Sequence, residues 1–242
     1  MEAQALLLWG LAAALAAGPG ALLGTWGWFA RHAVGWATAA AAGLMLGIGY
    51  VLLATGQAVA PAATLLGAFM GLLAVRLADS SPREPAGGLA VTARLSAPAD
   101  TDAGEILASA LHSAAEGVAI GAAAGVNGPL ARFLILTFAI HNISEGAVLG
   151  ALLTRRGWRA GAVAGMAVLA RTTQPLVAVS VIYLASALPA TLPWLIGASF
   201  GALLYLIVAE LLPQSYRLAG RTAIAVVVSI AAGIVALMGG GG

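Results

Sequence analysis

The sequence contains no cysteine and no lysine, and charged residues of any kind are scarce. Without cysteine there can be no disulfide framework and no thiolate metal ligand. Only 8% of the 242 residues are charged, whereas a soluble domain carries about 25%. In contrast, 61% of the residues are hydrophobic, and the mean hydropathy is +0.99. These values exclude a soluble globular domain and predict an all-α polytopic membrane protein.

Apolar runs of the length needed to cross a membrane, about 20 residues each, recur along the chain. We predict eight transmembrane helices in a bundle, at residues 3–24, 33–54, 58–78, 104–125, 130–152, 160–187, 192–213 and 220–238. The first run is expected to be a retained helix rather than a signal peptide, because Glu2 stands where a signal peptide carries positive charge. A tight turn at Thr55-Gly56-Gln57 is expected to join the second and third helices.

One long polar stretch, residues 79–103, divides the apolar runs. Its Ser, Pro, Gly and Asp content is typical of a loop. We therefore expect residues 1–78 to form helices 1–3, residues 79–103 a cytoplasmic loop, and residues 104–238 helices 4–8 with the metal site. The glycine run at 239–242 is expected to be a flexible tail.

The arginines between the predicted spans lie almost entirely on one side of the membrane. Arg132 alone falls on the other side, and the excess marks the cytoplasmic face. Both termini are then extracytoplasmic. The abundance of Ala, Gly and Arg, with no Lys, favours a prokaryotic inner (plasma) membrane protein. The cytoplasmic set is Arg31, Arg76, Arg83, Arg94, Arg155, Arg156, Arg159, Arg217 and Arg221.

Two copies of one short phrase stand inside the apolar runs. The first reads Leu-His-Ser-Ala-Ala-Glu-Gly at 111–117, and the second reads Ile-His-Asn-Ile-Ser-Glu-Gly at 140–146. Each places a histidine and a glutamate four residues apart, on one face of a helix. Ionisable residues in a membrane are costly, so such a pair is a functional-site hypothesis by default.

The two phrases are expected to meet. A turn near Asn127-Gly128-Pro129 would fold helices 4 and 5 into an antiparallel hairpin, with His112 opposite Glu145 and His141 opposite Glu116. Two imidazoles and two carboxylates suit Zn²⁺ or another divalent first-row ion, and two carboxylate charges neutralise one such ion. We therefore predict that this His/Glu quartet (His112, Glu116, His141 and Glu145) forms a metal site. The alternative is that each His only caps or hydrogen-bonds a neighbouring helix and each Glu only pairs with a His.

Other polar residues inside the spans have two interpretations each. Pro175 interrupts the sixth span and frees a backbone carbonyl, so the helix should kink there. The adjacent Gln174 then either faces the site or only satisfies the freed backbone. Glu210, in the seventh span, is either a ligand on an exit pathway or a partner of Arg217 at the membrane interface.

At these residues the chain resembles the ZIP family of divalent metal-ion transporters (Zrt/Irt-like proteins). That family carries His-Asn-x-Pro-Glu-Gly on its fourth helix and a related motif on its fifth. The resemblance runs the whole length, and Ala42–Gly47 and Glu210–Gln214 are also similar to family positions. It implies eight spans with both termini outside, a primary transport site at the His/Glu quartet, and an adjacent second position at Asn142.

The departures from the family pattern remove charge from the second position. Ser113 replaces the usual Asn, and Ala115 and Ser144 replace the usual prolines. Gln174-Pro175 stands where many relatives have Glu-Pro, and Gln214 replaces an acidic residue. We therefore expect one tightly bound ion. The neutral candidates beside the quartet are Ser113, Asn142 and Gln174.

The function expected is transport of a divalent metal ion toward the cytoplasm by alternating access. Zinc is the first candidate, followed by iron, manganese and cadmium, and metal should compete with protons for the His and Glu ligands. The alternatives are a non-transporting metal sensor, a degenerate membrane scaffold and an intramembrane metalloenzyme. The enzyme is disfavoured because no His-Glu-x-x-His is present. The expected partners are the ion and the bilayer, but not nucleic acid. The abundant small residues favour tight packing within one bundle, with GxxxG pairing into a homodimer as the alternative.

Overall fold

A computed structural model of the chain describes residues 2–78 and 102–239, and within these ranges every regular element is helical. The predicted 79–103 loop and the tail therefore lie almost wholly outside the described residues. The helix that follows the loop begins at Asp102, and the last helix includes Gly239.

The first predicted span consists of two helices, α1 (Ala3–Leu15) and α2 (Ala17–Gly24), which meet at Ala16. Pro19 has no N–H to donate to the carbonyl oxygen of Leu15, so the regular hydrogen-bond ladder is interrupted there.

The turn after the second span lies later than predicted. Helix α3 (Gly27–Val59) continues through Thr55-Gly56-Gln57, and α4 (Pro61–Ala78) begins after Ala60. The Thr55 hydroxyl donates to the carbonyl oxygen of Val51 at 2.8 Å, so this residue is part of the helix. The turn is set by Pro61, which disfavours helical backbone at the preceding residue and is tolerated in the first turn of a helix.

The two motif-bearing helices are α6 (Asp102–Val126) and α7 (Gly128–Arg155). The side chain of Asn127 caps α7 by accepting a hydrogen bond from the Leu130 N–H at 2.8 Å, and Pro129 occupies its first turn. Asparagine at this position and proline one or two residues later are strong helix-start signals. One helix therefore ends and the next begins at the residues where the sequence predicted a turn.

The remaining helices carry further interruptions. Helices α8 (Ala160–Arg171) and α9 (Thr173–Ala187) meet at Thr172, before Pro175 as predicted. A 3₁₀ turn, η1 (Pro189–Thr191), leads into α10 (Leu192–Leu206). A π-helical segment, η2 (Ile207–Leu211), then joins α10 to α11 (Leu212–Ala219). After Gly220, α12 (Arg221–Gly239) ends the described chain.

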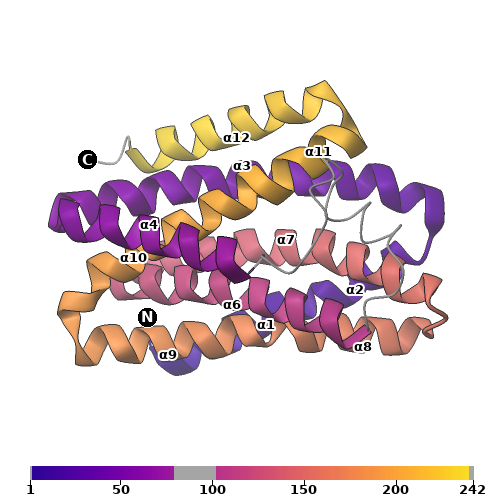
Figure 1. The fold of residues 1–242 in the computed structure, drawn as a ribbon, viewed down its shortest axis with the longest axis horizontal. Coiled ribbons are helices and arrows are strands. Elements are labelled where there is room, and N and C mark those ends of the chain that lie inside the picture. Colours follow the sequence, from indigo (N-terminus) through magenta and orange to yellow (C-terminus); the bar gives the residue numbers. More distant parts are fainter. Residues whose placement is uncertain (1, 79–101, 240–242) are drawn as a thin grey trace.

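The helices pack in two groups that do not follow the order of the sequence (Figure 1). Helices α1 and α2 lie against α7, α8 and α9, and α6 lies against α9; α4 lies against α10, and α12 against α3. One group thus contains α1, α2, α6, α7, α8 and α9, and the other contains α3, α4, α10, α11 and α12. Contacts of α3 with α7 and of α10 with α6 join them. Segments before and after the predicted loop therefore interdigitate.

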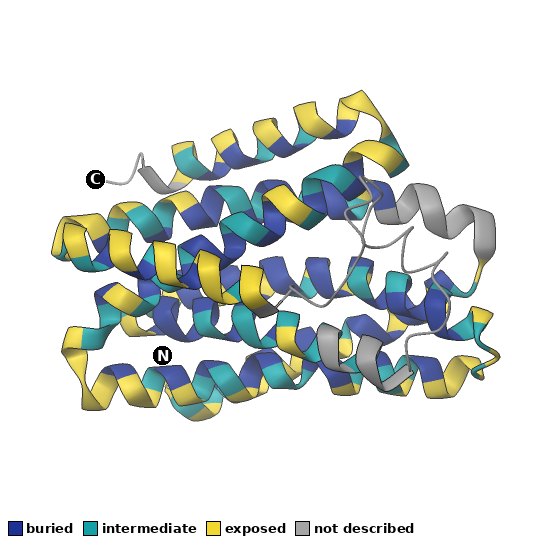
Figure 2. Ribbon diagram, viewed as in Figure 1, coloured by how far each residue is buried: buried dark blue, intermediate teal, exposed yellow. Residues whose placement is uncertain are grey.

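Burial is distributed as expected for a membrane protein. Large apolar side chains such as Phe69, Tyr183 and Leu237 are exposed on the outside, while Glu116, His141 and other polar groups are fully buried (Figure 2). By length and composition, five helical stretches can cross a membrane, and α4 and α12 are apolar but shorter. The five are Ala3–Gly24, Gly35–Val59, Gly128–Arg155, Ala160–Ala187 and Pro189–Ala219. The chain has the features of a helical membrane protein.

Candidate metal centre

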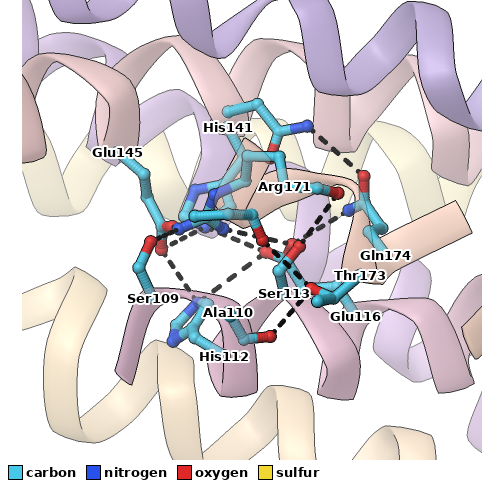
Figure 3. A network of polar contacts seen from close by, with 12 residues as sticks. Ser109, Ala110, His112, Ser113, Glu116, His141, Glu145, Arg171, Thr173 and Gln174 are labelled. Carbon is cyan, nitrogen blue, oxygen red and sulfur yellow. Dashed lines mark hydrogen bonds and ion pairs between the residues drawn. The ribbon is translucent and has the colours of Figure 1, made fainter. Parts of the chain in front are cut away.

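The His/Glu quartet comes together where α6 and α7 cross inside the bundle (Figure 3). His112 Nε2 lies 2.9 Å from Glu145 Oε1, and His141 Nε2 lies 3.0 Å from Glu116 Oε1. These are the two cross-pairs expected from the turn at Asn127. Within each helix, His112 Nε2 lies 3.7 Å from Glu116 Oε1, and His141 Nε2 lies 2.9 Å from Glu145 Oε1.

These distances fit four ligands around one ion. Neighbouring ligand atoms of a tetrahedral zinc site, with metal–ligand bonds of about 2.0–2.1 Å, lie about 3.3 Å apart. The four His–Glu distances, 2.9, 2.9, 3.0 and 3.7 Å, fall on both sides of this value. One ligand atom from each residue lies within 4.8 Å of all the others. The quartet could therefore hold one metal ion without rearrangement of its helices.

Three of the four ligand atoms contact one another as ion pairs but make no hydrogen bond of acceptable geometry. In the part of the chain that the structure describes, His112 Nε2, Glu116 Oε1 and His141 Nε2 are buried and make no hydrogen bond of acceptable geometry. Buried polar atoms are normally hydrogen-bonded, and exceptions require an explanation such as a missing ion. Here the exceptions share one small space, and a cation among them would satisfy all three.

Arg171, at the end of α8, reaches the opposite side of both carboxylates. Its Nη2 contacts Glu145 Oε2 directly and donates to Ser109 Oγ at 2.7 Å, and its Nη1 lies 3.6 Å from Glu116 Oε2. Only 3% of the Arg171 side chain is exposed. The sequence does not predict a role for this arginine at the site, because spacing alone does not show which way one residue beside a helix break will point.

Gln174 and Asn142 form a polar chain beside the quartet. Gln174 Nε2 donates to Glu116 Oε2 at 2.9 Å, and Asn142 Nδ2 donates to Gln174 Oε1 at 3.3 Å. Asn142 Nδ2 also donates to the carbonyl oxygen of Ala13 at 3.0 Å. Of the two interpretations offered by the sequence, the structure therefore places the Gln174 side chain at the site. Both amides are fully buried.

The Ser113 side chain forms its hydrogen bond at the α8–α9 junction and not with the quartet. Pro175 cannot donate to the carbonyl oxygen of Arg171, four residues earlier, and Ser113 Oγ donates to that oxygen at 3.4 Å. Thr173 Oγ1 adds a second tie by donating to the carbonyl oxygen of Ala110 on α6 at 2.9 Å. These bonds hold the α8–α9 junction, and with it Arg171 and Gln174, against α6.

Glu210 approaches the centre from the second group of helices. Its Oε2 lies 3.7 Å from His112 Nδ1, the ring nitrogen that faces away from the quartet. The residue stands in the π-helical segment η2, an irregularity that is frequent at functional sites. A carboxylate behind a metal-binding imidazole orients the ring and raises its basicity.

The glycine that follows each motif glutamate allows helices to approach closely. A Cβ atom on Gly117 would meet the carbonyl oxygen of Gln174 on α9, and one on Gly146 would meet the carbonyl oxygen of Ala17 on α2. The structure shows that both face neighbouring backbone.

Comparisons with protein-family models and with curated proteins find no match for this chain. The interpretation of the centre therefore depends on its residues and their geometry.

Proposed function

We propose that the protein transports a divalent metal ion, with zinc the first candidate, and that it is a transporter of the ZIP type. The observation that carries the proposal is the convergence of two matched His/Glu pairs, from two helices, on one small space where three buried ligand atoms make no hydrogen bond of acceptable geometry. A site of this kind inside an apolar bundle would lie on a path for the ion across the membrane. The proposed activity is movement of the ion, without covalent chemistry.

The proposed topology has eight crossings with both termini outside the cytoplasm. It adds α4, α6 and α12 to the five long apolar stretches; these helices have 18, 25 and 19 residues. At 1.5 Å per residue the shortest is about 27 Å long, close to the hydrocarbon thickness of a bilayer. The arginine asymmetry supports the orientation, with uptake across a prokaryotic plasma membrane toward the cytoplasm.

Alternating access would move the two helix groups relative to each other. Every member of the quartet, with Arg171 and Gln174, belongs to the group of α1, α2 and α6–α9, whereas Glu210 belongs to the other group. The contact of Glu210 with His112 therefore spans the boundary between the groups. Sliding along this boundary would carry the ion with its ligands.

Uptake into liposomes tests the proposal. Purified protein is reconstituted into vesicles that contain a metal-sensitive fluorophore, and Zn²⁺, Fe²⁺, Mn²⁺ and Cd²⁺ are supplied outside. We expect saturable uptake that is lost in the double variant Glu116→Gln/Glu145→Gln. The matched control is Glu2→Gln, which changes an exposed carboxylate. Uptake by the double variant at the wild-type rate would contradict the proposal.

A non-transporting scaffold or metal sensor is the second candidate, and one observation favours it. Arg171 and Gln174 already contact the two carboxylates, so an all-protein polar network holds part of the site together. The same experiment separates the candidates, because a sensor binds metal without uptake and a scaffold does neither.

A further inference from the structure

The two carboxylates of the quartet divide their oxygen atoms between two sides. Oε1 of Glu116 and Oε1 of Glu145 both face the imidazoles, at 2.9–3.7 Å from the Nε2 atoms. Oε2 of Glu116 and Oε2 of Glu145 both face Arg171. A guanidinium therefore lies across the carboxylate pair from the candidate metal position.

This arrangement is the one that a pair of cations bridged by carboxylates would adopt. In two-metal sites the ions lie about 3.5–4 Å apart, and each carboxylate can give one oxygen to each ion. Here the first position is lined by two imidazoles and two Oε1 atoms, whereas the second already contains a fixed positive charge. Gln174, a neutral amide, completes this second side by donating to Glu116 Oε2 at 2.9 Å.

The charges around the centre also match one divalent ion. Glu116, Glu145 and Glu210 contribute three negative charges, and Arg171 contributes one positive charge. The remaining two negative charges are neutralised by one divalent ion bound to neutral imidazoles. A second divalent ion would leave two uncompensated positive charges in a low-dielectric interior, where like charges repel strongly.

We propose that Arg171 takes the place of a second metal ion, so that the centre binds a single divalent cation, and that it positions both carboxylates by holding their Oε2 atoms. This inference rests on the proposed metal-binding function. It assigns Arg171 as the residue that fixes how many ions the centre holds. Ser109, which accepts from Arg171 Nη2 at 2.7 Å, keeps the guanidinium in this place.

The test measures how many Zn²⁺ ions the purified protein binds, by equilibrium dialysis and elemental analysis. We expect one ion per chain for the wild type and for Arg171→Lys, which keeps the charge. In Arg171→Ala the vacated position should take a second ion. We expect the affinity for this ion to be at least about tenfold above that for any second ion in the wild type, which corresponds to about 1.4 kcal/mol of binding free energy. The matched control is Arg132→Ala, which removes an exposed arginine at the start of α7 and should leave one ion.

A folded Arg171→Ala protein that still binds one ion at saturating Zn²⁺ would overturn the inference while leaving metal binding intact. A wild type that binds no ion would instead reject the proposed function, and the inference with it. If Arg171→Ala does not fold, Arg171→Lys provides a second measurement, because the chain has no other lysine. With ¹³C,¹⁵N-lysine, the single side-chain signal should shift until one equivalent of Zn²⁺ is added and then stay constant. An unchanged signal on Zn²⁺ binding would place this cation away from the ion and overturn the inference.

Discussion

At the scale of single residues, the candidate metal centre depends on which oxygen of each carboxylate faces which partner. Glu116 and Glu145 each present one oxygen to the imidazoles and the other to Arg171. Because of this division, Arg171 compensates part of the negative charge of both carboxylates. It also gives each neighbouring residue a distinct role that substitution can test.

Loss of Glu145 should cost both activity and stability. Glu145→Gln removes the negative charge, and its single amide oxygen cannot face both the ion and Arg171 as the two carboxylate oxygens do. Breaking a buried ion pair from one side costs about 3–5 kcal/mol. We expect no measurable uptake and a lower unfolding temperature in detergent, measured without metal. Glu2→Gln should match the wild type in both assays. Retained stability in Glu145→Gln would show that the Arg171 contact contributes little.

Gln174→Glu should make the centre depend on metal. The new carboxylate would face Glu116 Oε2, to which Gln174 now donates at 2.9 Å, so two like charges would be forced together in the interior. Without metal we expect a lower unfolding temperature than in the wild type, and with Zn²⁺ a larger increase in that temperature. The comparison variant is Gln57→Glu, at an exposed site on α3. Equal Zn²⁺ responses in the two variants would refute this prediction.

The quartet could be predicted from the sequence because its signal is local. Each His and Glu are one helical turn apart, and Asn127 with Pro129 marks the reversal, so the cross-pairing of His112 with Glu145 follows from counting residues. Arg171 could not be placed in this way. It stands beside an interrupted helix, where helical periodicity no longer gives direction, and its position depends on packing of α8 and α9 against α6.

At the scale of the helices, prolines account for most of the breaks that the sequence predicted. Pro175 leaves the carbonyl oxygen of Arg171 without its usual backbone donor, and this oxygen accepts a hydrogen bond from the Ser113 side chain instead. The one misplaced turn has the same origin, since Pro61 sets the end of α3 more strongly than the flexible sequence Thr55-Gly56-Gln57. Gly56 belongs to a helix that packs closely against Thr64. A glycine in a membrane helix is therefore a weaker turn signal than a proline.

Close packing of α6 on α9 should be needed for the geometry of the centre. In Gly117→Ala the added Cβ would meet the carbonyl oxygen of Gln174 and lie 2.9 Å from Val177 Cβ, and such overpacking costs about 1–3 kcal/mol. Because Gln174 would be displaced, we expect weaker Zn²⁺ binding as well as a lower unfolding temperature. Gly165→Ala, on α8, has no heavy atom within 4 Å of its new Cβ and should change neither. If Gly117→Ala binds Zn²⁺ with wild-type affinity, the close packing of α6 on α9 is not needed for the geometry of the centre.

At the scale of the whole molecule, the polar groups lie inside and the apolar side chains outside. Glu116, His141 and Arg171 are buried in the bundle, whereas Phe69 and Leu237 are 65% and 83% exposed. In water this apolar surface would be unfavourable, but in lipid it carries no penalty because the lipid tails are equally apolar. The two helix groups meet at the centre, so a change in their relative position would change access to the site.

The orientation of this bundle can be tested with single cysteines, because the chain has none of its own. The arginine asymmetry predicts that the η1 turn between α9 and α10 lies outside and that the start of α8 lies in the cytoplasm. Ala190→Cys and Ala160→Cys place exposed thiols at these two sites. In intact cells, a membrane-impermeant thiol reagent should label Ala190→Cys and spare Ala160→Cys, and permeabilised cells should allow both to be labelled. The opposite pattern in intact cells would reverse the topology, and with it the proposed direction of metal transport. If both sites are labelled in intact cells, both lie outside, so the chain between residues 160 and 190 does not cross the membrane an odd number of times. The eight-crossing topology would then be wrong.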